Sequence, residues 1–184
     1  YLILKLTLKE GSRTTSGKES RKAIAVMPVS NFTGNPEMEW IAEMIQSDLT
    51  GQLQGISNLI VRPRQTTLQF RNSDETIQEI ARKLSVDNLI ESSIKGSEEE
   101  LLVEIRVVEA FPEERYLYRS SFSESFSGLT SAYTDIINRL LKGMEVKATE
   151  KEAKVIAARN VNPEVKKACA RGLYYMNQLT KEGF

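Results

Sequence analysis

A run of polar side chains in the segment SNFTGNP is the first place in this sequence where chemistry could occur. Asn31, Thr33 and Asn35 stand at alternate positions, after the apolar run AIAVMPV of residues 23–29 and before an acidic helix start. Open α/β sheets bind ligands at the carboxyl ends of their strands, so these amide and hydroxyl groups could bind a polar ligand. The same turn could also cradle a phosphate or serve as a structural corner.

A phosphate site is the least favoured of these three interpretations. Phosphate loops need several glycines that bare backbone N–H groups, and a helix N-terminus free of negative charge. Gly34 is the only glycine of the turn, and Glu37 and Glu39 occupy the first turn of the helix that follows. These carboxylates stabilise the helix dipole and repel an anion, so a structural corner is favoured. Contact of the polar side chains with another kind of ligand stays open.

Catalytic and metal-binding chemistry has few candidate residues. The chain has no histidine, which removes the usual general base, the usual zinc ligand and the usual activator of a nucleophile. The single cysteine, Cys169, has no CxxC partner and is predicted to be a packed thiol. Asp48 could act in catalysis, but its place on the polar flank of a predicted helix favours a surface role. No cofactor and no metal are therefore expected.

Arginines and the single tryptophan offer further candidate contacts. Arg62, Arg64 and Arg71 surround the second predicted strand and could face an anionic ligand, although pairing with nearby glutamates favours an ordinary surface role. Trp40 could anchor a partner as an exposed aromatic side chain, while burial against the sheet is the favoured alternative. The candidate ligand- or partner-binding residues are Asn31, Thr33, Asn35, Trp40 and Arg64.

The charge balance limits the partners. Twenty-five Lys and Arg residues match twenty-five Asp and Glu residues, so no net charge draws the chain to nucleic acid or to an anionic membrane. The aromatic side chains of Tyr116, Tyr118 and Phe122 have too few interleaved basic residues for a base-stacking platform. Protein partners and an unknown small molecule remain, and nucleic acid is not expected to bind this domain.

Hydrophobic periodicity predicts the elements that position these residues. A continuous apolar run predicts a buried strand over 23–29. Apolar residues at steps of three and four predict a helix from Pro36 to about Gln54, with Asn35 as its cap. A second buried strand over 58–62 completes a strand-helix-strand crossover, and the right-handed connection places the two strands parallel.

The next segments predict two more helices and an antiparallel meander. A short helix over 66–70 and an amphipathic helix over 77–84 come first, and Ser127 is predicted to cap a later helix that ends near Met144. Short connections between the strands that lie between these helices indicate antiparallel hairpins. The predicted fold is α/β, in the order βαβαβββα, with a mixed sheet of about five strands, helices packed on the sheet and a C-terminal helical segment. The three meander strands are expected at 87–95, 100–109 and 115–125.

Both ends of the chain lie outside this sheet. YLILKLTL, residues 1–8, alternates as a strand does, although it could also be the end of a membrane helix, and residues 9–21 are predicted to be a flexible connector. Beyond Lys147 a charged, alanine-rich helix is expected. Asn162-Pro163-Glu164 repeats the cap, proline and acid of the first helix start, so a last helix is predicted to run from there to about Gln178.

Residues 23–53, AIAVMPVSNFTGNPEMEWIAEMIQSDLTGQL, resemble the TolB-like amino-terminal domain of bacterial signalling and envelope proteins. The family pattern is a small-apolar strand ending in Val-x-Pro-Phe, then Asn-x-(Ser/Thr)-Gly-(Asn/Asp)-Pro-Glu and an acidic helix. The likeness continues in residues 61–70, 81–110 and 115–122. Polar positions depart from the family more often than apolar ones, so the fold is a firmer expectation than any binding residue. The departures are Met44, Asn88, Ser92, Arg106 and Tyr118.

The resemblance implies a domain organisation. In such proteins an output domain and often a membrane helix come first, and tetratricopeptide repeats follow. Residues 1–20 would then be an N-terminal strand or juxtamembrane segment with a linker, residues 21–147 the TolB-like α/β domain, and residues 148–184 a helical linker and the first helix of a repeat. A periplasmic location is expected and a cytoplasmic one stays open, and a membrane tether could precede residue 1.

The functional prediction is a non-catalytic recognition or sensor module of a larger signalling or envelope protein. Such a module would bind a small molecule or a protein and pass its state to neighbouring segments by a population shift. The alternative is an interaction scaffold in envelope assembly or secretion that has no small-molecule ligand. An enzyme that uses Asp48 is the least favoured interpretation.

Overall fold

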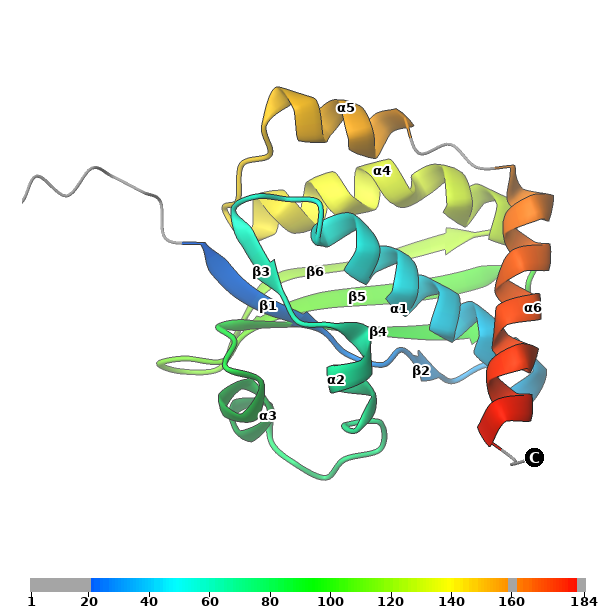
Figure 1. Cartoon of the computed structure of the whole chain (residues 1–184), viewed down its shortest axis with the longest axis horizontal. Helices are drawn as coiled ribbons and strands as arrows, with labels where there is room; N and C mark the ends of the chain where they lie inside the picture. Colours follow the sequence, from blue (N-terminus) through cyan, green and yellow to red (C-terminus); the bar gives the residue numbers. More distant parts are fainter. Residues whose placement is uncertain (1–20, 159–161, 182–184) are drawn as a thin grey trace, which may run out of the picture.

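A six-stranded mixed sheet flanked by helices forms the centre of the computed structural model, which describes residues 21–158 and 162–181 (Figure 1). The strand order is β3-β1-β4-β5-β6, and β2 pairs with β4 beyond the end of β1. The strands are β1 (Lys22–Val26), β2 (Ser30–Asn31), β3 (Leu59–Val61), β4 (Asn88–Gly96), β5 (Leu101–Glu109) and β6 (Arg115–Glu124). The predicted α/β class is confirmed. The predictions for residues 1–20, including the strand over 1–8, lie outside the described residues.

Helices account for most of the remaining described chain. The elements are the 3-10 turn η1 (Pro36–Met38) and the helices α1 (Glu39–Leu53), α2 (Arg64–Leu68), α3 (Ile77–Leu84), α4 (Phe126–Gly143), α5 (Glu150–Ala158) and α6 (Pro163–Lys181). Among the described residues, none of these helices is both long enough and apolar enough to cross a bilayer.

Two crossovers around β1 build the parallel half of the sheet. β1 pairs in parallel with β3 on one side and with β4 on the other, which confirms the predicted crossover. The connection from β1 to β3 packs α1 on one face of the sheet, and the connection from β3 to β4 packs α3 on the opposite face (Figure 1). The chain goes from β1 to β3 on one side of β1 and then returns to β4 on the other side. Because both parallel crossovers are right-handed, these opposite directions put the two connecting helices on opposite faces of the sheet.

Strands β4, β5 and β6 form the predicted antiparallel meander. Its second pairing contains a bulge, since Val107 lies opposite Tyr118 and Val108 opposite Tyr116, which leaves Leu117 as an extra residue on β6. A bulge increases the local twist and shifts which side chains share a face. The simple alternation of aromatic residues along this strand therefore stops at Leu117.

The main core lies between the sheet and the helices α1 and α4. Alternate side chains of β5 point to this side and are buried, namely Leu101, Val103, Ile105 and Val107. Trp40 at the start of α1 packs on Phe126 at the start of α4, with ring centroids 5.2 Å apart. Burying each such aliphatic or aromatic side chain contributes about 1.5–3 kcal/mol, so this layer supplies most of the stabilisation of the sheet.

The opposite face of the sheet is covered in part by α3. This helix begins with a capping box, in which Thr76 and Glu79 bond to each other's backbone N–H groups, and its apolar stripe packs on β1 and β4. Beyond α3 the same face carries charged side chains, among them Glu91, Glu104 and Arg106, which stay partly exposed. We call this part of β4, β5 and β6 the open face.

One strand boundary differs from the prediction. The strand expected over 23–29 ends at Val26, and the chain pairs again with β4 only at Ser30 and Asn31. Pro28 lies within the gap and has no N–H to offer to a ladder, so the interruption has a covalent cause. Two residues show no period, and the sequence therefore did not reveal β2.

The start of α4 also needs correction. Ser125, not Ser127, caps the helix by accepting a hydrogen bond from the N–H of Gly128 at 3.1 Å. Phe126 is buried against Trp40, so it already belongs to the first turn of the helix. The predicted start was therefore two residues late.

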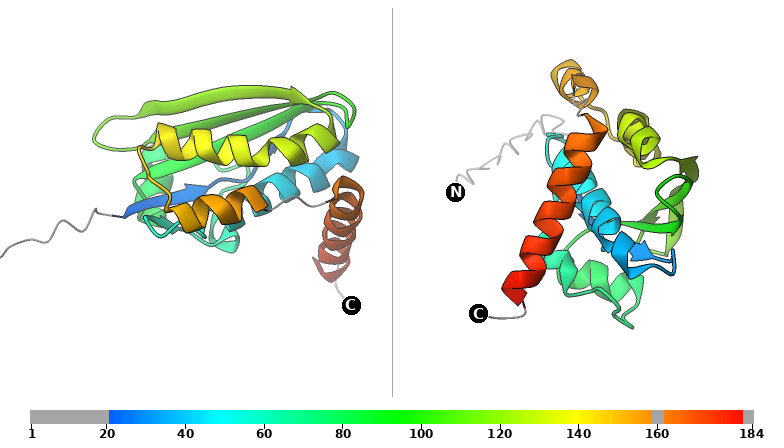
Figure 2. Two further views of the ribbon diagram at one scale, coloured as in Figure 1. Left: turned by 90° about the horizontal axis from the view of Figure 1, so that it is seen from above. Right: turned by 90° about the vertical axis from the view of Figure 1, so that its right-hand side faces the viewer.

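Two helices follow the sheet. α5 lies beside α4, and α6 crosses the ends of α1 and α4 (Figure 2). Glu152 of α5 accepts hydrogen bonds from the N–H groups of Ser57 at 2.8 Å and Thr149 at 2.7 Å. Asn162 caps α6 by accepting from the N–H of Glu164 at 2.9 Å, as the repeated Asn-Pro-Glu motif predicts. The proposed domain boundary at residue 147 stays a prediction.

Candidate functional site

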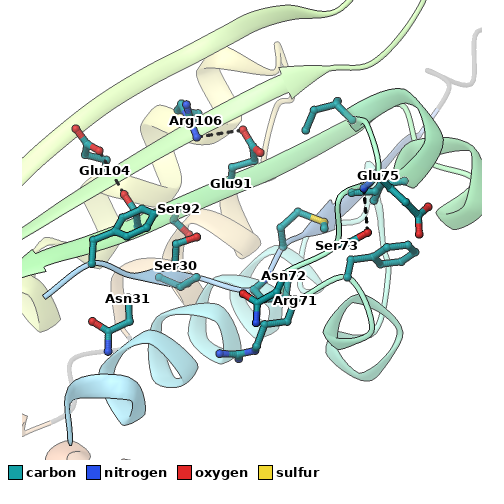
Figure 3. A pocket seen from close by; sticks show the side chains of 18 of the residues that line it. Ser30, Asn31, Arg71, Asn72, Ser73, Glu75, Glu91, Ser92, Glu104 and Arg106 are labelled. Atoms are coloured by element: carbon teal, nitrogen blue, oxygen red, sulfur yellow. Dashed lines mark hydrogen bonds and ion pairs between the residues drawn. The ribbon is translucent and has the colours of Figure 1, made fainter. Parts of the chain in front are cut away.

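A groove of about 940 Å³ lies at the carboxyl end of β1 and runs onto the open face (Figure 3). One wall is the segment of residues 27–32, which leaves β1 and includes β2. The other wall is formed by residues 70–73 and Glu75, in the chain between α2 and α3. Charged side chains of β4, β5 and β6 form the floor.

The groove owes its position to the sheet topology. After β1 the chain turns toward α1 on one face, and after β3 it turns toward α3 on the other face. Where neighbouring parallel strands send their connections to opposite faces, the loops diverge and leave a crevice, which is the usual ligand site of open α/β sheets. The predicted location of ligand binding, at the carboxyl ends of the parallel strands, coincides with this groove.

The floor of the groove carries a row of charges. Glu91 and Arg106 form an ion pair at 3.5 Å, and Lys95 donates a hydrogen bond to Glu104 at 3.3 Å. This hydrogen bond and the charge of Lys95 hold the pKa of the Glu104 carboxyl below its usual value. Arg119 lies directly opposite Arg106 in the ladder and lines the same groove. Its side chain forms no ion pair or hydrogen bond with the described residues, and its charge also helps to lower the pKa of Glu104.

The walls combine an exposed aromatic ring with paired polar groups. Phe32 is 63% exposed although it is a large apolar side chain. Arg71 pairs with Glu39 and lies 3.8 Å from Glu43, so its charge is matched. Asn72 has a φ of 60° and stands at the rim beside Arg71. Figure 3 shows Arg71 and Asn72 on one wall of the groove and Asn31 on the other, where the Asn31 side chain points away from Glu91 and Arg106.

The corner that connects β2 with η1 is held by its own polar side chains. Asn31 accepts hydrogen bonds from the N–H and hydroxyl of Thr33 at 3.0 and 2.7 Å, and donates to the carbonyl of Asn35 at 3.1 Å. Asn35 accepts from the N–H of Glu37 at 3.0 Å, and Gly34 takes the left-handed conformation at a φ of 74°. These bonds support the structural-corner interpretation. Of the three polar candidates, Asn31 lines the groove.

The other two candidate binding residues lie away from the groove. Trp40 is 2% exposed and packs in the main core, so it offers no exposed ring to a partner with α6 in place. Arg64 pairs with Glu43 at 3.1 Å and donates to the side-chain oxygen of Gln46 at 3.1 Å. Both residues line a smaller hollow of about 240 Å³ between α1 and α6.

The helix α6 joins the domain through polar contacts, and we call this contact the α6 joint. Lys166 pairs with Asp48 at 2.5 Å, Lys167 pairs with Glu98, and the hydroxyl of Tyr175 donates to Glu37 at 2.9 Å. The aspartate weighed as a catalytic carboxylate is thus paired with a lysine. Few large apolar side chains of α6 take part, so much of the joint depends on matched charges.

An aromatic layer lies beneath this joint. The guanidinium of Arg171 stands 5.9 Å from the ring centroid of Trp40, and the ammonium of Lys166 stands 4.2 Å from that of Tyr133. Burial raises the pKa of the Tyr133 hydroxyl well above its ordinary value, and the negative charge of Asp48 adds to this effect. Cys169 on α6 is exposed, which corrects the prediction of a packed thiol.

Sequence reasoning missed the floor of the groove. Arg106 and Arg119 were not candidates, because each arginine is an ordinary surface residue when its strand is considered alone. A signal was present in β5, where Glu104 and Arg106 alternate with the buried residues of the main core. What the sequence could not supply was the register, which brings Arg119 opposite Arg106. Within the described part of the chain, no cluster of carboxylate and thiol groups could hold a metal ion.

Comparisons with known proteins give distant similarities. No protein-family model matches the chain. The chain is 21% identical over 146 residues to "Putative adenylate cyclase 3" of Rhizobium meliloti (strain 1021), a match that covers 79% of this chain and 25% of that protein. The chain therefore spans about a quarter of the length of this curated relative.

Several solved structures are also distantly similar. TolB from Acinetobacter baumannii matches with a TM-score of 0.45 and 10% identity, over 67% of this chain and 28% of that chain. Lipoprotein GNA1162 from Neisseria meningitidis matches at 0.44 and 14%, over 76% of this chain and 99% of that chain. The LpoB C-terminal domain from Escherichia coli matches at 0.42 and 13%, over 59% of this chain and 86% of that chain. No residue role passes from these proteins to this chain.

Proposed function

We propose that residues 21–147 form a non-catalytic recognition module that binds a small molecule in the groove and passes this state to α6. The observation that carries the proposal is the groove itself. Its volume of about 940 Å³ lies within the range of small-molecule sites, and its place at the divergence of two crossovers is where such folds bind ligands. The floor and rim offer charged and polar groups beside an exposed ring, which suits recognition of a polar molecule.

A short series of neighbouring residues connects the groove with the α6 joint. Arg71 lines the groove and pairs with Glu39 and Glu43 of α1. These three residues, together with Tyr174 of α6, line a small hollow of about 220 Å³. Burial and then the charge of Glu39 raise the pKa of the Tyr174 hydroxyl, which agrees with their proximity. A ligand that shifts Arg71 would therefore change the surroundings of α6.

The corner provides a second connection. Asn31 lines the groove at one end of this segment, and Glu37 accepts the hydroxyl of Tyr175 at the other end. Because the hydrogen bonds among Asn31, Thr33 and Asn35 make the corner stiff, a movement at the groove would be transmitted rather than absorbed. The ligand must bind one arrangement of α6 better than another for this coupling to act.

We place this module in a larger bacterial signalling or envelope protein. The resemblance to TolB-like domains supports this placement, and so does the name of the curated relative, which is about four times as long as the matched segment. A periplasmic location stays our expectation, with a cytoplasmic one as the alternative. An upstream membrane tether and a tetratricopeptide repeat that opens with α6 are further parts of the proposal.

Thermal-shift screening of a metabolite panel, followed by calorimetry, tests the module. Asn72→Gly removes a side chain from the rim without backbone strain, because glycine accepts a φ of 60°. It should weaken a groove ligand by about three- to tenfold through the loss of a hydrogen bond, whereas Gln78→Ala on α3, which does not line the groove, should leave binding unchanged. Trp40 is the single tryptophan, and its fluorescence should report a change at α6 on binding. A ligand that binds Asn72→Gly as tightly as the native chain would place the site elsewhere.

A protein scaffold without a small-molecule ligand is the second candidate function. Large apolar side chains on α6 favour it, since Leu173, Met176 and Leu179 are each more than 60% exposed. Exposed apolar side chains that gather on one element commonly mark a protein contact. A chain that responds to no metabolite, yet captures a partner only when these side chains are intact, would support the scaffold over the sensor.

A further inference from the structure

Two arginines face each other across the floor of the groove. The ladder places Arg106 of β5 directly opposite Arg119 of β6, and both side chains line the groove. Like charges directly opposite in an antiparallel pair are destabilising. A cross-strand arginine pair therefore has a cost in the free protein, which an anion bridging the two guanidinium groups would remove.

The neighbouring carboxylates compensate only part of this charge. Glu91 pairs with Arg106 at 3.5 Å, and Glu104 is hydrogen-bonded by Lys95 at 3.3 Å. Arg119 forms no ion pair or hydrogen bond with the described residues, and its charge acts on the Glu104 carboxylate only as a weaker, longer-range attraction. Each carboxylate that lines the groove is paired with a cationic side chain, so Arg119 is the one lining cation without an ion pair among the described residues. One unpaired guanidinium suits a single negative charge, and the four carboxylates around the groove disfavour a multiply charged anion.

Apolar side chains stand around these charges. Phe32 is exposed at one wall, and Phe70, Ile77 and Ile80 line the other side of the groove. A volume of about 940 Å³ accommodates a ligand much larger than an inorganic ion. The groove therefore combines one anion-binding position with room for an apolar body.

We infer that the groove binds a small monocarboxylic acid, whose carboxylate bridges Arg119 and Arg106 and whose apolar body lies against Phe32 and Phe70. Guanidinium groups bind carboxylates through paired, parallel hydrogen bonds, which gives the site both affinity and orientation. Arg106 is already 5.8 Å from the ring centroid of Tyr116, so one side of its guanidinium is held by an aromatic ring. This inference rests on the proposed function and specifies its ligand class.

Calorimetry and NMR amide-shift mapping with three acids and their primary amides test the ligand class. The probes are octanoate, phenylpropionate and cinnamate, compared with octanamide, phenylpropionamide and cinnamide, and with inorganic phosphate. At least one acid should shift the amides of the groove segments and bind at least about tenfold more tightly than its amide. Arg119→Gln should abolish this difference, whereas Arg115→Gln, on the same strand but paired with Glu109 outside the groove, should preserve it.

The outcomes separate this inference from the proposed function. Acids that bind no better than their amides, or that bind Arg119→Gln unchanged, overturn the inference, as does the absence of groove shifts with every acid. The inference is also overturned if phosphate binds in the groove more tightly than the acids and displaces them, because the site would then recognise negative charge without an apolar body. In each case a different metabolite bound in the groove, and weakened by Asn72→Gly, would leave the recognition function standing. Arg119 is exposed, so its substitution should leave the chain folded.

Discussion

The two faces of strands β4, β5 and β6 lie back to back and have opposite characters. On the face under α1 and α4, Ile105 and its alternate neighbours are buried in one continuous core. On the open face, Glu104 and Arg106 alternate with them and line a groove. One residue of offset along the strand thus separates a position that stabilises the fold from a position that can bind a ligand.

The largest expected effect comes from two neighbours on β5. Ile105→Ala removes buried methylene and methyl groups and leaves a cavity, so it should lower the free energy of unfolding by about 2–5 kcal/mol. Glu104→Gln keeps the shape of a partly exposed side chain and should change it by less than about 0.5 kcal/mol. Urea unfolding followed by circular dichroism measures both. Equal losses at the two positions would mean that the open face also serves as core.

Helix caps provide a comparison that should not depend on the face. Thr76→Ala removes the capping box of α3, on the side of the open face, and Ser125→Ala removes the cap of α4 on the covered side. Each should lower the free energy of unfolding by about 1 kcal/mol, because each leaves a helix N–H group without its partner. Thermal unfolding of the two variants should give similar shifts. A much larger loss for Ser125→Ala would show that the cap also positions Phe126 in the core.

Much of the covered face was predictable, because its apolar residues recur at the regular spacing of strands and helices. Buried strands and amphipathic helices repeat at two residues and at steps of three and four, which gave the element order and the parallel and antiparallel pairings. The two-residue strand β2 has no period, and the bulge at Leu117 breaks one. For the groove, the sequence predicted only a general location, at the carboxyl ends of the parallel strands. Its floor needed the ladder register, and the α6 joint needed contacts between residues far apart in sequence.

The helix α5 forms the outermost layer on the covered side, and the pH dependence of unfolding tests how Glu152 holds it. Hydrogen bonds from the N–H of Thr149, and then from Ser57, lower the pKa of Glu152 to about 2 from an ordinary value of 4.5. A lowered pKa means that this contact stabilises the fold fully above pH 4.5 and is lost as the pH falls toward 2. Glu152→Gln should therefore reduce the acid dependence of unfolding between these pH values, as followed by circular dichroism. An unchanged acid profile would show that the carboxylate does not hold α5 in solution.

The smallest expected effect comes from a substitution on the open face that should stabilise the chain, whereas the substitutions above should destabilise it. Arg119→Gln relieves the repulsion with the directly opposite Arg106, which outweighs the lost attraction to the more distant Glu104, and should raise the free energy of unfolding of the ligand-free chain by about 0.2–0.5 kcal/mol. The gain should shrink in high salt, which screens exposed charges. Arg115→Gln, which breaks an ion pair with Glu109, should give no gain in the same urea titrations. A residue that destabilises the free protein is retained more readily when it acts on a ligand, so destabilisation by Arg119→Gln would remove the physical reason to assign it a binding role.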